Sequence, residues 1–261
     1  MEIMKKFLCV FLGVLLFLTG CEKNPSETEK PTQSEEKTVE IPIDKTKKEA
    51  SPLDGKIILI DAGHGINSST EKEPVAPGSS EKKRAFVEGT TGKNQTEEEL
   101  NLSVALKLEA ELLKKGANVH MTRKDHKCEL SNVGRAELGN ELGADLVVRI
   151  HADGNNNKNV SGASCLIPGD RYIDDEEMLK KSRMAGEIIL EEYVLETGAK
   201  NNGIAVRNDM TGFNWSKVPV ILMEMGFMTN PGDDALMETE EYQGKIVTGI
   251  MNGLERYFDE V

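Results

Sequence analysis

The sequence is short of positive charge. Its 261 residues include 32 Lys and Arg against 45 Asp and Glu, which gives a formal net charge of -13. An acidic balance of this size argues against nucleic acid as the main partner. It also argues against electrostatic attachment to anionic lipid, so contact with a membrane would need a covalent or hydrophobic anchor.

The N-terminal apolar run is too short to predict a transmembrane helix. It covers residues 7–18, follows two lysines and has the length of the core of a secretory signal. It ends in the tetrapeptide LTGC, which resembles the bacterial lipobox, where the cysteine is lipid-modified and becomes the mature N-terminus. We therefore expect residues 1–20 to be a lipoprotein signal peptide and acylated Cys21 to hold the protein in the bilayer, outside the cytoplasm. An ordinary signal peptide or signal anchor is the alternative.

Cysteine is sparse as well. Of four cysteines, Cys9 falls in the signal and Cys21 is the expected lipid site, which leaves Cys128 and Cys165. Two cysteines do not make a disulfide framework, and their spacing lacks the CxxC pattern of a cysteine zinc site. We expect both to be free or optionally bridged.

The chain divides into a polar N-terminal part and one folded domain. Residues 22–52 are mainly Lys, Glu, Thr, Ser and Pro, and such a segment cannot bury enough apolar surface to offset chain entropy. We interpret residues 21–54 as a disordered membrane tether and residues 55–261 as the domain. No internal repeat is evident.

Alternation of strands and helices predicts the fold class. Three apolar runs are typical of strands buried on both faces: KIILID at 56–61, DLVVRI at 145–150 and VPVILM at 218–223. Shorter strands and helices are expected between them, and 66–95 is expected to be a long surface loop. The expected strands are 56–61, 118–122, 145–150, 162–168, 203–206 and 218–223, and the expected helices are 96–115, 131–142, 174–196 and 240–257. The result is a single α/β domain with a mostly parallel, open sheet of about six strands flanked by helices.

Each of the three buried strands leads into an ionisable residue. KIILID leads to His64, DLVVRI to His151 and VPVILM to Glu224. In open α/β sheets, ligands bind outside the carboxyl ends of the strands, so these side chains are expected at one edge. Two imidazoles and a carboxylate are a typical catalytic zinc set, with water in the open position and a further carboxylate as general base.

The second carboxylate should come from the helix that Thr96 opens. Glu97, Glu98 and Glu99 all lie in its first turn, and Glu99 is best placed as the capping-box partner of Thr96. Glu97 shares a helix face with Asn101 and can point to the sheet. The pattern alone favours Glu97 only slightly over Glu98.

Four segments together resemble the zinc-dependent N-acetylmuramoyl-L-alanine amidases of the Amidase_3 type. They are IDAGHG, TEEELNLSVALKLEAELLKKGANVHMTR, LSNVGRAELGNELGADLVVRIHADG and VPVILMEMGFMTN, and the likeness covers essentially all of residues 56–257. The resemblance implies the phosphorylase/hydrolase-like fold of that family, a Zn²⁺ ion held by His64, Glu97 and His151, and Glu224 as the catalytic residue. It implies hydrolysis of the amide between N-acetylmuramic acid and L-alanine in peptidoglycan, and we expect a monomer.

Two positions depart from the family pattern. Ile66 stands where a second glycine often follows His-Gly, and Asp153 stands where the family commonly has Asn. Neither change removes a ligand, although both could alter loop shape or substrate contacts. The competing functions are a zinc peptidase acting on stem peptides and a non-catalytic, wall-binding regulatory lipoprotein.

Three further residues have two interpretations each. Asp61 could orient a ligand histidine or cap its strand. Arg135 could bind a substrate carboxylate or anchor its helix through an ion pair. Trp215, the only tryptophan, could stack on the substrate or pack against the domain.

Overall fold

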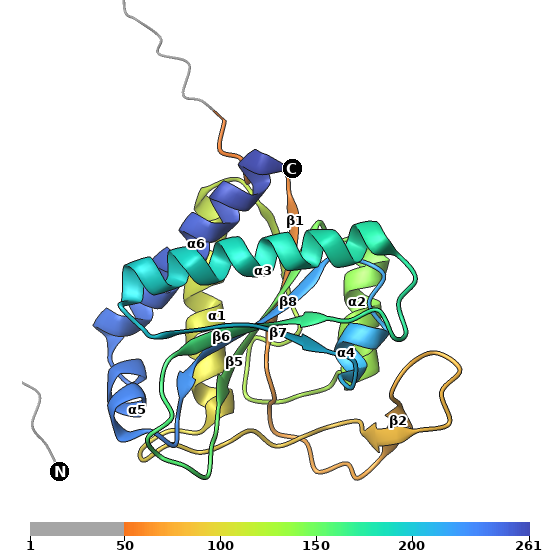
Figure 1. Ribbon diagram of the computed structural model, residues 1–261, viewed down its shortest axis with the longest axis horizontal. Coiled ribbons are helices and arrows are strands. Elements are labelled where there is room, and N and C mark those ends of the chain that lie inside the picture. The colour runs from red at the N-terminus through yellow and green to blue at the C-terminus, as the bar shows by residue number, and fades with distance from the viewer. Residues whose placement is uncertain (1–49) are drawn as a thin grey trace, which may run out of the picture. The chain divides into compact units, whose positions relative to one another are not determined.

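The computed structural model describes residues 50–261 (Figure 1). The predicted signal peptide, Cys21 and most of the predicted tether lie outside these residues. Within the described part, no helix is long and apolar enough to cross a membrane. The folded part already includes Leu53, which is fully buried two residues before the expected start of the domain.

A six-stranded sheet forms the centre of the domain, in the order β4-β1-β5-β8-β6-β7. All neighbouring strands run parallel except β6 and β8, which are antiparallel, so the predicted mostly parallel sheet is confirmed. The strands are β1 Ile57–Ala62, β4 Asn118–Met121, β5 Leu146–Asp153, β6 Ala163–Pro168, β7 Asn201–Arg207 and β8 Val220–Phe227.

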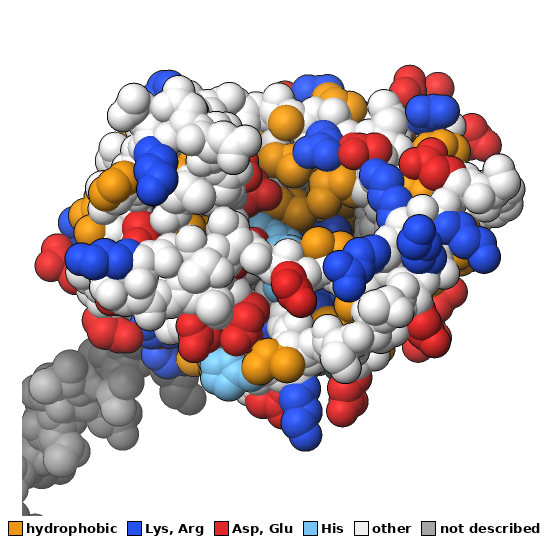
Figure 2. All heavy atoms as spheres, turned by 90° about the horizontal axis from the view of Figure 1, so that it is seen from below, with side chains coloured by type: hydrophobic (Ala, Val, Ile, Leu, Met, Phe, Trp, Pro, Cys, Tyr) orange, Lys and Arg blue, Asp and Glu red, His pale blue; other side chains and the backbone are white. Residues whose placement is uncertain are grey.

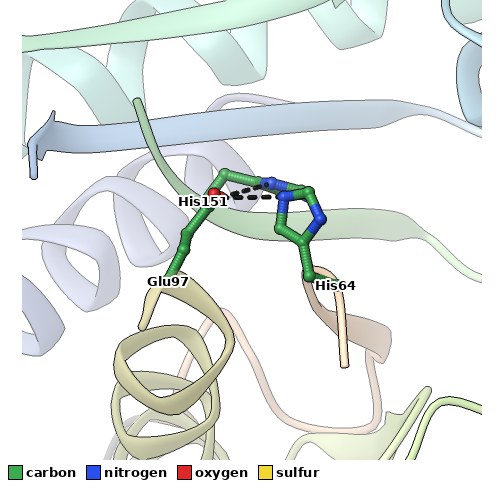
Figure 3. Close-up of side chains that lie close together, drawn as sticks. All are labelled: His64, Glu97 and His151. Carbon is green, nitrogen blue, oxygen red and sulfur yellow. Dashed lines mark hydrogen bonds and ion pairs between the residues drawn. The ribbon is translucent and has the colours of Figure 1, made fainter. Parts of the chain in front are cut away.

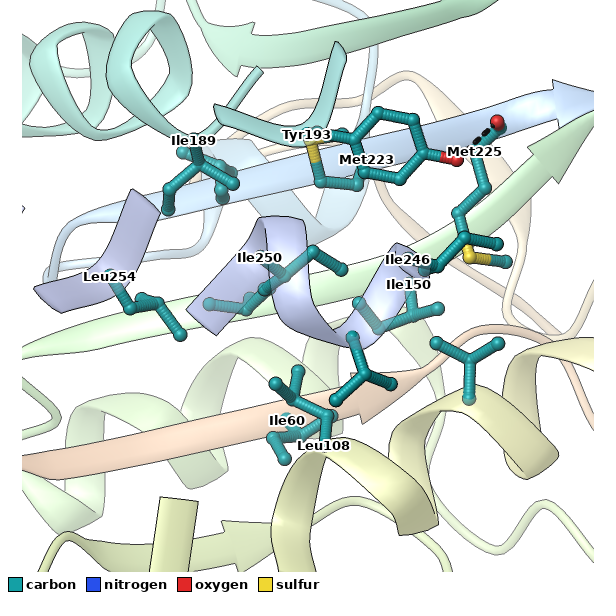
Figure 4. Close-up of a cluster of buried hydrophobic side chains, with 14 of the residues drawn as sticks. Ile60, Leu108, Ile150, Ile189, Tyr193, Met223, Met225, Ile246, Ile250 and Leu254 are labelled. Atoms are coloured by element: carbon teal, nitrogen blue, oxygen red, sulfur yellow. Dashed lines mark hydrogen bonds between the residues drawn. The ribbon is translucent and has the colours of Figure 1, made fainter. Parts of the chain in front are cut away.

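Helices cover both faces of the sheet (Figure 1). The larger core lies between the sheet and three helices, and its side chains include Leu108, Ile150, Tyr193, Met223 and Ile250 (Figure 4). The smaller core, around Phe213, lies on the opposite face. The helices of the larger core are α1 Glu97–Lys114, α3 Glu176–Thr197 and α6 Glu240–Glu260; α2 Asn132–Leu142 and α4 Thr211–Asn214 lie on the opposite face, and α5 Pro231–Met237 precedes α6.

Local sequence signals set the ends of the helices near the sheet edge. Thr96 and Glu99 form the predicted capping box at the start of α1, with both reciprocal hydrogen bonds present. Ser131 caps α2, and Gly143 ends it in the left-handed conformation at φ 59°. These ends matter because the capping box places Glu97 in the first turn of α1.

The segment expected as a plain surface loop is more ordered than the sequence suggested. It contains a two-stranded hairpin, β2 Lys72–Pro74 with β3 Lys82–Arg84. Strands of three residues, here Lys-Glu-Pro and Lys-Lys-Arg, carry no readable periodicity, so the sequence could not reveal them. The hairpin is held from outside: Nε1 of Trp215 donates to Pro74 O at 2.9 Å, and Nδ2 of Asn214 donates to Val75 O at 3.0 Å.

Candidate active site

His64 lies just beyond the end of β1, between two glycines. Its φ of 62° is the only positive value at a non-glycine residue in the described part of the chain, and such a conformation costs free energy. The ring is held by the segment that follows, because Nδ1 lies 2.8 Å from the carbonyl oxygen of Val87. A carbonyl only accepts, so Nδ1 carries a proton and Nε2 points the other way.

Glu97 is buried at the first position of α1, where backbone donors hold both of its oxygens. The amide of Thr90 donates to Oε2 at 2.8 Å, and the amide of Ala152 donates to Oε1 at 3.2 Å. The two neighbouring glutamates point elsewhere: Glu98 pairs with Arg123 and Glu99 caps the helix. The structure therefore places Glu97, rather than Glu98, at the sheet edge.

His151 brings the second imidazole to the same carboxylate oxygen. Nε2 of His64 and Nδ1 of His151 each lie 3.0 Å from Oε1 of Glu97 (Figure 3). One ligand atom from each residue lies within 4.8 Å of the others, which is the spacing of a possible metal site. His64 follows the end of β1 and His151 lies in β5, so the strand ends deliver the two imidazoles as predicted. The carboxylate comes from the first turn of α1.

The ring nitrogens of His64 and His151 and the carboxylate of Glu97 are together suited to bind a cation. With the proton of His64 on Nδ1, a neutral ring presents the lone pair of Nε2 to a carboxylate oxygen, and two acceptors at 3.0 Å repel each other. A proton or a metal ion between them removes that repulsion. Two histidine nitrogens and one carboxylate oxygen are a zinc ligand set that leaves a fourth position open.

The pKa shifts of Glu97 and His64 both favour positive charge near the Glu97 carboxylate, whereas the shift of His151 favours its neutral form. Burial would raise the pKa of Glu97, but its bonds to His151 and His64 outweigh burial and hold that pKa well below its usual range. Burial would lower the pKa of His64, but the bond to Glu97 and its charge raise it. Burial lowers the pKa of His151 to about 4, so this ring is neutral near pH 7 and able to bind a metal.

Glu224 lies beside this cluster, in register with His151 across β5 and β8. It is inside β8 rather than beyond its end, because pairing continues to Phe227 through a register shift. Its Oε2 is buried without a hydrogen bond among the described residues. Burial, together with the charges of Glu97 and Asp153, raises the pKa of Glu224 well above its ordinary value.

A cleft of about 750 Å³ opens over these four residues. Figure 2 shows the hollow, with histidine visible inside it. A carboxyl group poised to hold a proton, next to a cation site in an open cleft, is the arrangement needed for metal-assisted hydrolysis.

The structure tests the two interpretations of Asp61 and of Arg135. Asp61 has no hydrogen bond to either histidine; it accepts from Arg135, from Nε of Arg149 at 2.7 Å and from Thr122 at 2.8 Å. The ion-pair interpretation of Arg135 is confirmed, and its Nη2 also donates to the backbone oxygen of His64 at 2.6 Å. Asp61 therefore does not orient a ligand histidine through a hydrogen bond, and it does not cap its strand, because β1 continues to Ala62. It binds the two arginines instead.

The remaining predictions about single side chains are also decided. Trp215 packs on the hairpin and is not among the residues that line the cleft. Cys128 and Cys165 are both buried, free thiols.

The groups that hold the site in place could not be identified from the sequence. The carbonyl of Val87 and the amide of Thr90 come from the predicted loop, and backbone groups leave no sequence signal. Gly89 packs so closely that an added Cβ would lie 2.7 Å from Oε2 of Glu97. Arg149, which lines the cleft, was missed because it lies in an otherwise apolar strand.

Fold and site together define a class of protein: an α/β domain with a His-Glu-His cluster and a buried glutamate at the carboxyl edge of a mostly parallel sheet. The family model for N-acetylmuramoyl-L-alanine amidase, Amidase_3, matches residues 58–256. The chain belongs to this family of peptidoglycan amidases.

Individual relatives agree with this assignment. The chain is 29% identical over 212 residues to "Uncharacterized protein YqiI" of Bacillus subtilis, covering 81% of this chain and 89% of that protein. It is 26% identical over 221 residues to "Probable cell wall amidase LytH" of Staphylococcus aureus, covering 84% of this chain but 64% of the relative.

Solved structures show the same fold. The amidase Ami1 from Mycobacterium smegmatis superposes with a TM-score of 0.74 at 24% identity, over 80% of this chain and 99% of that one. An N-acetylmuramoyl-L-alanine amidase from Clostridium difficile 630 gives a TM-score of 0.64 at 28% identity, over 79% and 98%.

Proposed function

We propose that this protein is a zinc-dependent hydrolase of linear amides that cuts the bond between N-acetylmuramic acid and L-alanine in peptidoglycan. The observation that carries the proposal is the approach of His64 and His151 to one oxygen of Glu97, each at 3.0 Å, beside Glu224. The family supports amidase chemistry on the cell wall.

His64, Glu97 and His151 would hold the ion. When bound, zinc lowers the pKa of a coordinated water and polarises a carbonyl. Thr90 and Ala152 fix the carboxylate of Glu97, and Val87 fixes the tautomer of His64.

Glu224 supplies the proton transfers. As a carboxylate it accepts a proton from the attacking water, and as a carboxylic acid it donates that proton to the leaving nitrogen of L-alanine. Burial of its carboxyl group raises the pKa of Glu224 and so favours the protonated form that donates to the leaving nitrogen.

The expected cellular setting also belongs to this proposal. Acylation of Cys21 would tether the domain to the outer face of the cell membrane, where peptidoglycan is within reach. Metabolic labelling with a fatty acid tests it: Cys21→Ala should abolish labelling and release the protein from the membrane fraction.

Digestion of purified cell wall tests the reaction. The purified protein should release free L-alanine amino groups and leave muramic acid intact, should lose activity to a chelator and should regain it with Zn²⁺. Metal analysis should give one zinc ion per chain, and His64→Ala should abolish both zinc binding and hydrolysis.

Other results would favour the competing functions. New amino groups at a position inside the stem peptide would identify a peptidase with the same ligand set. Bound zinc without any hydrolysis of wall from several sources would indicate a non-catalytic wall protein. Hydrolysis that is unchanged in both His64→Ala and Glu224→Ala would rule out the zinc mechanism.

A further inference from the structure

Arg149 is a buried cation in the wall of the catalytic cleft. It lies on β5 two residues before His151, so both side chains are on the same face of the sheet. It is 5% exposed and lines the cleft together with Gly212, Leu222 and Glu224. Its position is fixed by Nε, which donates to Asp61 at 2.7 Å.

Within residues 50–261, no hydrogen bond reaches the outer edge of this guanidinium, whose Cζ lies 5.9 Å from the centre of the Phe213 ring. Among the described residues, the hydrogen bonds of Arg149 involve Nε only, so Nη1 and Nη2 remain available. Gly212 makes room for them, since an added Cβ there would lie 2.5 Å from Nη1. Asp61 cannot neutralise Arg149 fully, because it also pairs with Arg135. A buried cation with two free donors favours an anionic ligand.

The wall of the cleft carries further positive charge. Lys83 and Arg84 of β3 line it, and Figure 2 shows Lys and Arg side chains gathered along one side of the hollow. Asp209 is already paired with Lys83 and Arg207, so it offers little negative charge to a ligand. Asp153 lies on the other side of His151 along β5.

The separation between Arg149 and His151 matches the length of two residues of the proposed peptide substrate. Two residues along a strand advance roughly 7 Å, which separates Arg149 from the reacting centre at His151 and Glu224. An extended peptide also advances roughly 7 Å over two residues. If L-alanine leaves at the metal, the α-carboxylate of the second stem-peptide residue, a γ-linked D-glutamate, lies at this distance.

We propose that Arg149, with Gly212, Leu222 and Arg84, forms a subsite that binds this carboxylate and makes the protein selective for stem peptides in which it is not amidated. The subsite rests on the proposed amidase function. A fixed guanidinium binds a carboxylate through two parallel hydrogen bonds, whereas a carboxamide offers one acceptor and no charge.

The test compares two soluble substrates that differ at one group: muramoyl-L-Ala-D-Glu and muramoyl-L-Ala-D-isoglutamine peptides. The zinc-loaded wild type should show a kcat/KM about tenfold or more higher for the carboxylate form. Arg149→Met should bring the ratio close to one, mainly by raising KM for the carboxylate form. Equal kcat/KM values in the wild type, or an unchanged ratio in Arg149→Met, would overturn the subsite.

Two further variants guard against a folding defect, because Arg149 also pairs with Asp61. Gly212→Ala leaves the charge in place but displaces the guanidinium, and should lower the ratio at an unchanged zinc content. Arg183→Met, on the exposed side of α3, is the matched control and should keep the wild-type ratio. A ratio unaffected by Gly212→Ala would contradict the proposed geometry.

A binding measurement separates this inference from the proposed function. If the zinc-loaded wild type hydrolyses neither substrate, the amidase proposal fails. Calorimetry with the dipeptides L-Ala-D-Glu and L-Ala-D-isoglutamine then tests carboxylate binding at the subsite independently of hydrolysis. Tighter binding of the acid that is lost in Arg149→Met supports it, and equal binding of both dipeptides overturns it.

Discussion

The carbonyl oxygen of Val87 lies 2.8 Å from Nδ1 of His64, although 23 residues separate them. This contact fixes which nitrogen of His64 carries the proton and directs Nε2 toward Glu97. The segment from Val87 to Thr90 therefore belongs to the candidate metal site, to which it contributes backbone groups rather than ligand side chains.

Close packing of that segment should be necessary for metal binding. Gly89→Ala would place a Cβ 2.7 Å from Oε2 and 2.8 Å from Cβ of Glu97, so the carboxylate or the segment must move. We expect zinc affinity to fall about 10–100-fold, as for other groups that orient ligands. Competition with a chromophoric chelator measures it. Gly244→Ala in α6, where a Cβ meets nothing within 4 Å, should leave the affinity unchanged.

Three consecutive glutamates should respond differently to the same change. Glu97→Gln should abolish zinc binding, because it removes the charge that the two imidazoles face. Glu98→Gln should retain zinc, since Glu98 pairs with Arg123. Glu99→Gln should retain zinc and lose about 1 kcal/mol or less of stability at the helix cap. Metal analysis and thermal unfolding of the three variants check this. Zinc bound as tightly by Glu97→Gln as by the wild type would contradict the role of the Glu97 charge in metal binding.

Glu224→Gln should separate catalysis from metal binding. The variant should bind one zinc ion as the wild type does, while kcat falls about 10²–10⁴-fold for lack of proton transfer. Its melting temperature should equal or exceed that of the wild type, because the ionised form of Glu224 is costly where it lies. Muropeptide release and thermal unfolding measure the two effects. Near-normal turnover would mean that another group moves the proton.

Asp61→Asn should destabilise the domain by about 3–5 kcal/mol at neutral pH, because it leaves two buried arginines without their carboxylate. Burial would raise the pKa of Asp61, but Arg135 and Arg149 hold it far below its unfolded value of 3.8. The stabilisation is therefore complete above that value and is lost as pH falls below it.

Urea unfolding at a series of pH values checks this dependence. The difference between wild type and Asp61→Asn should stay constant from neutral pH to about pH 5 and narrow below about pH 4. The exposed Asp259→Asn should show no such difference. A gap that widens on acidification would contradict the assigned sign.

Local signals in the sequence were sufficient for most of the fold. Runs such as DLVVRI predict buried strands because a strand with helices on both sides is apolar on both faces. Thr96 with Glu99, and Ser131 with Gly143, predict helix ends because caps depend on neighbouring residues only. The hairpin β2–β3 and the short helix α4 escaped because they depend on contacts with distant residues. Helix α5 was missed although it carries local signals, the cap of Asn230 and a proline at its first position.

The sequence by itself determined the order along the chain of the six sheet strands and the four long helices, and the delivery of His64, His151 and Glu224 to one edge of the sheet. It left two glutamates, Glu97 and Glu98, as candidates for the carboxylate ligand of the metal. The tertiary structure alone decided that Glu97 meets both imidazoles, that Arg135 is structural and that Arg149 faces the cleft. The reason is physical: periodicity and capping are local properties of the chain, whereas the direction of a long polar side chain depends on which distant charges and carbonyls it meets.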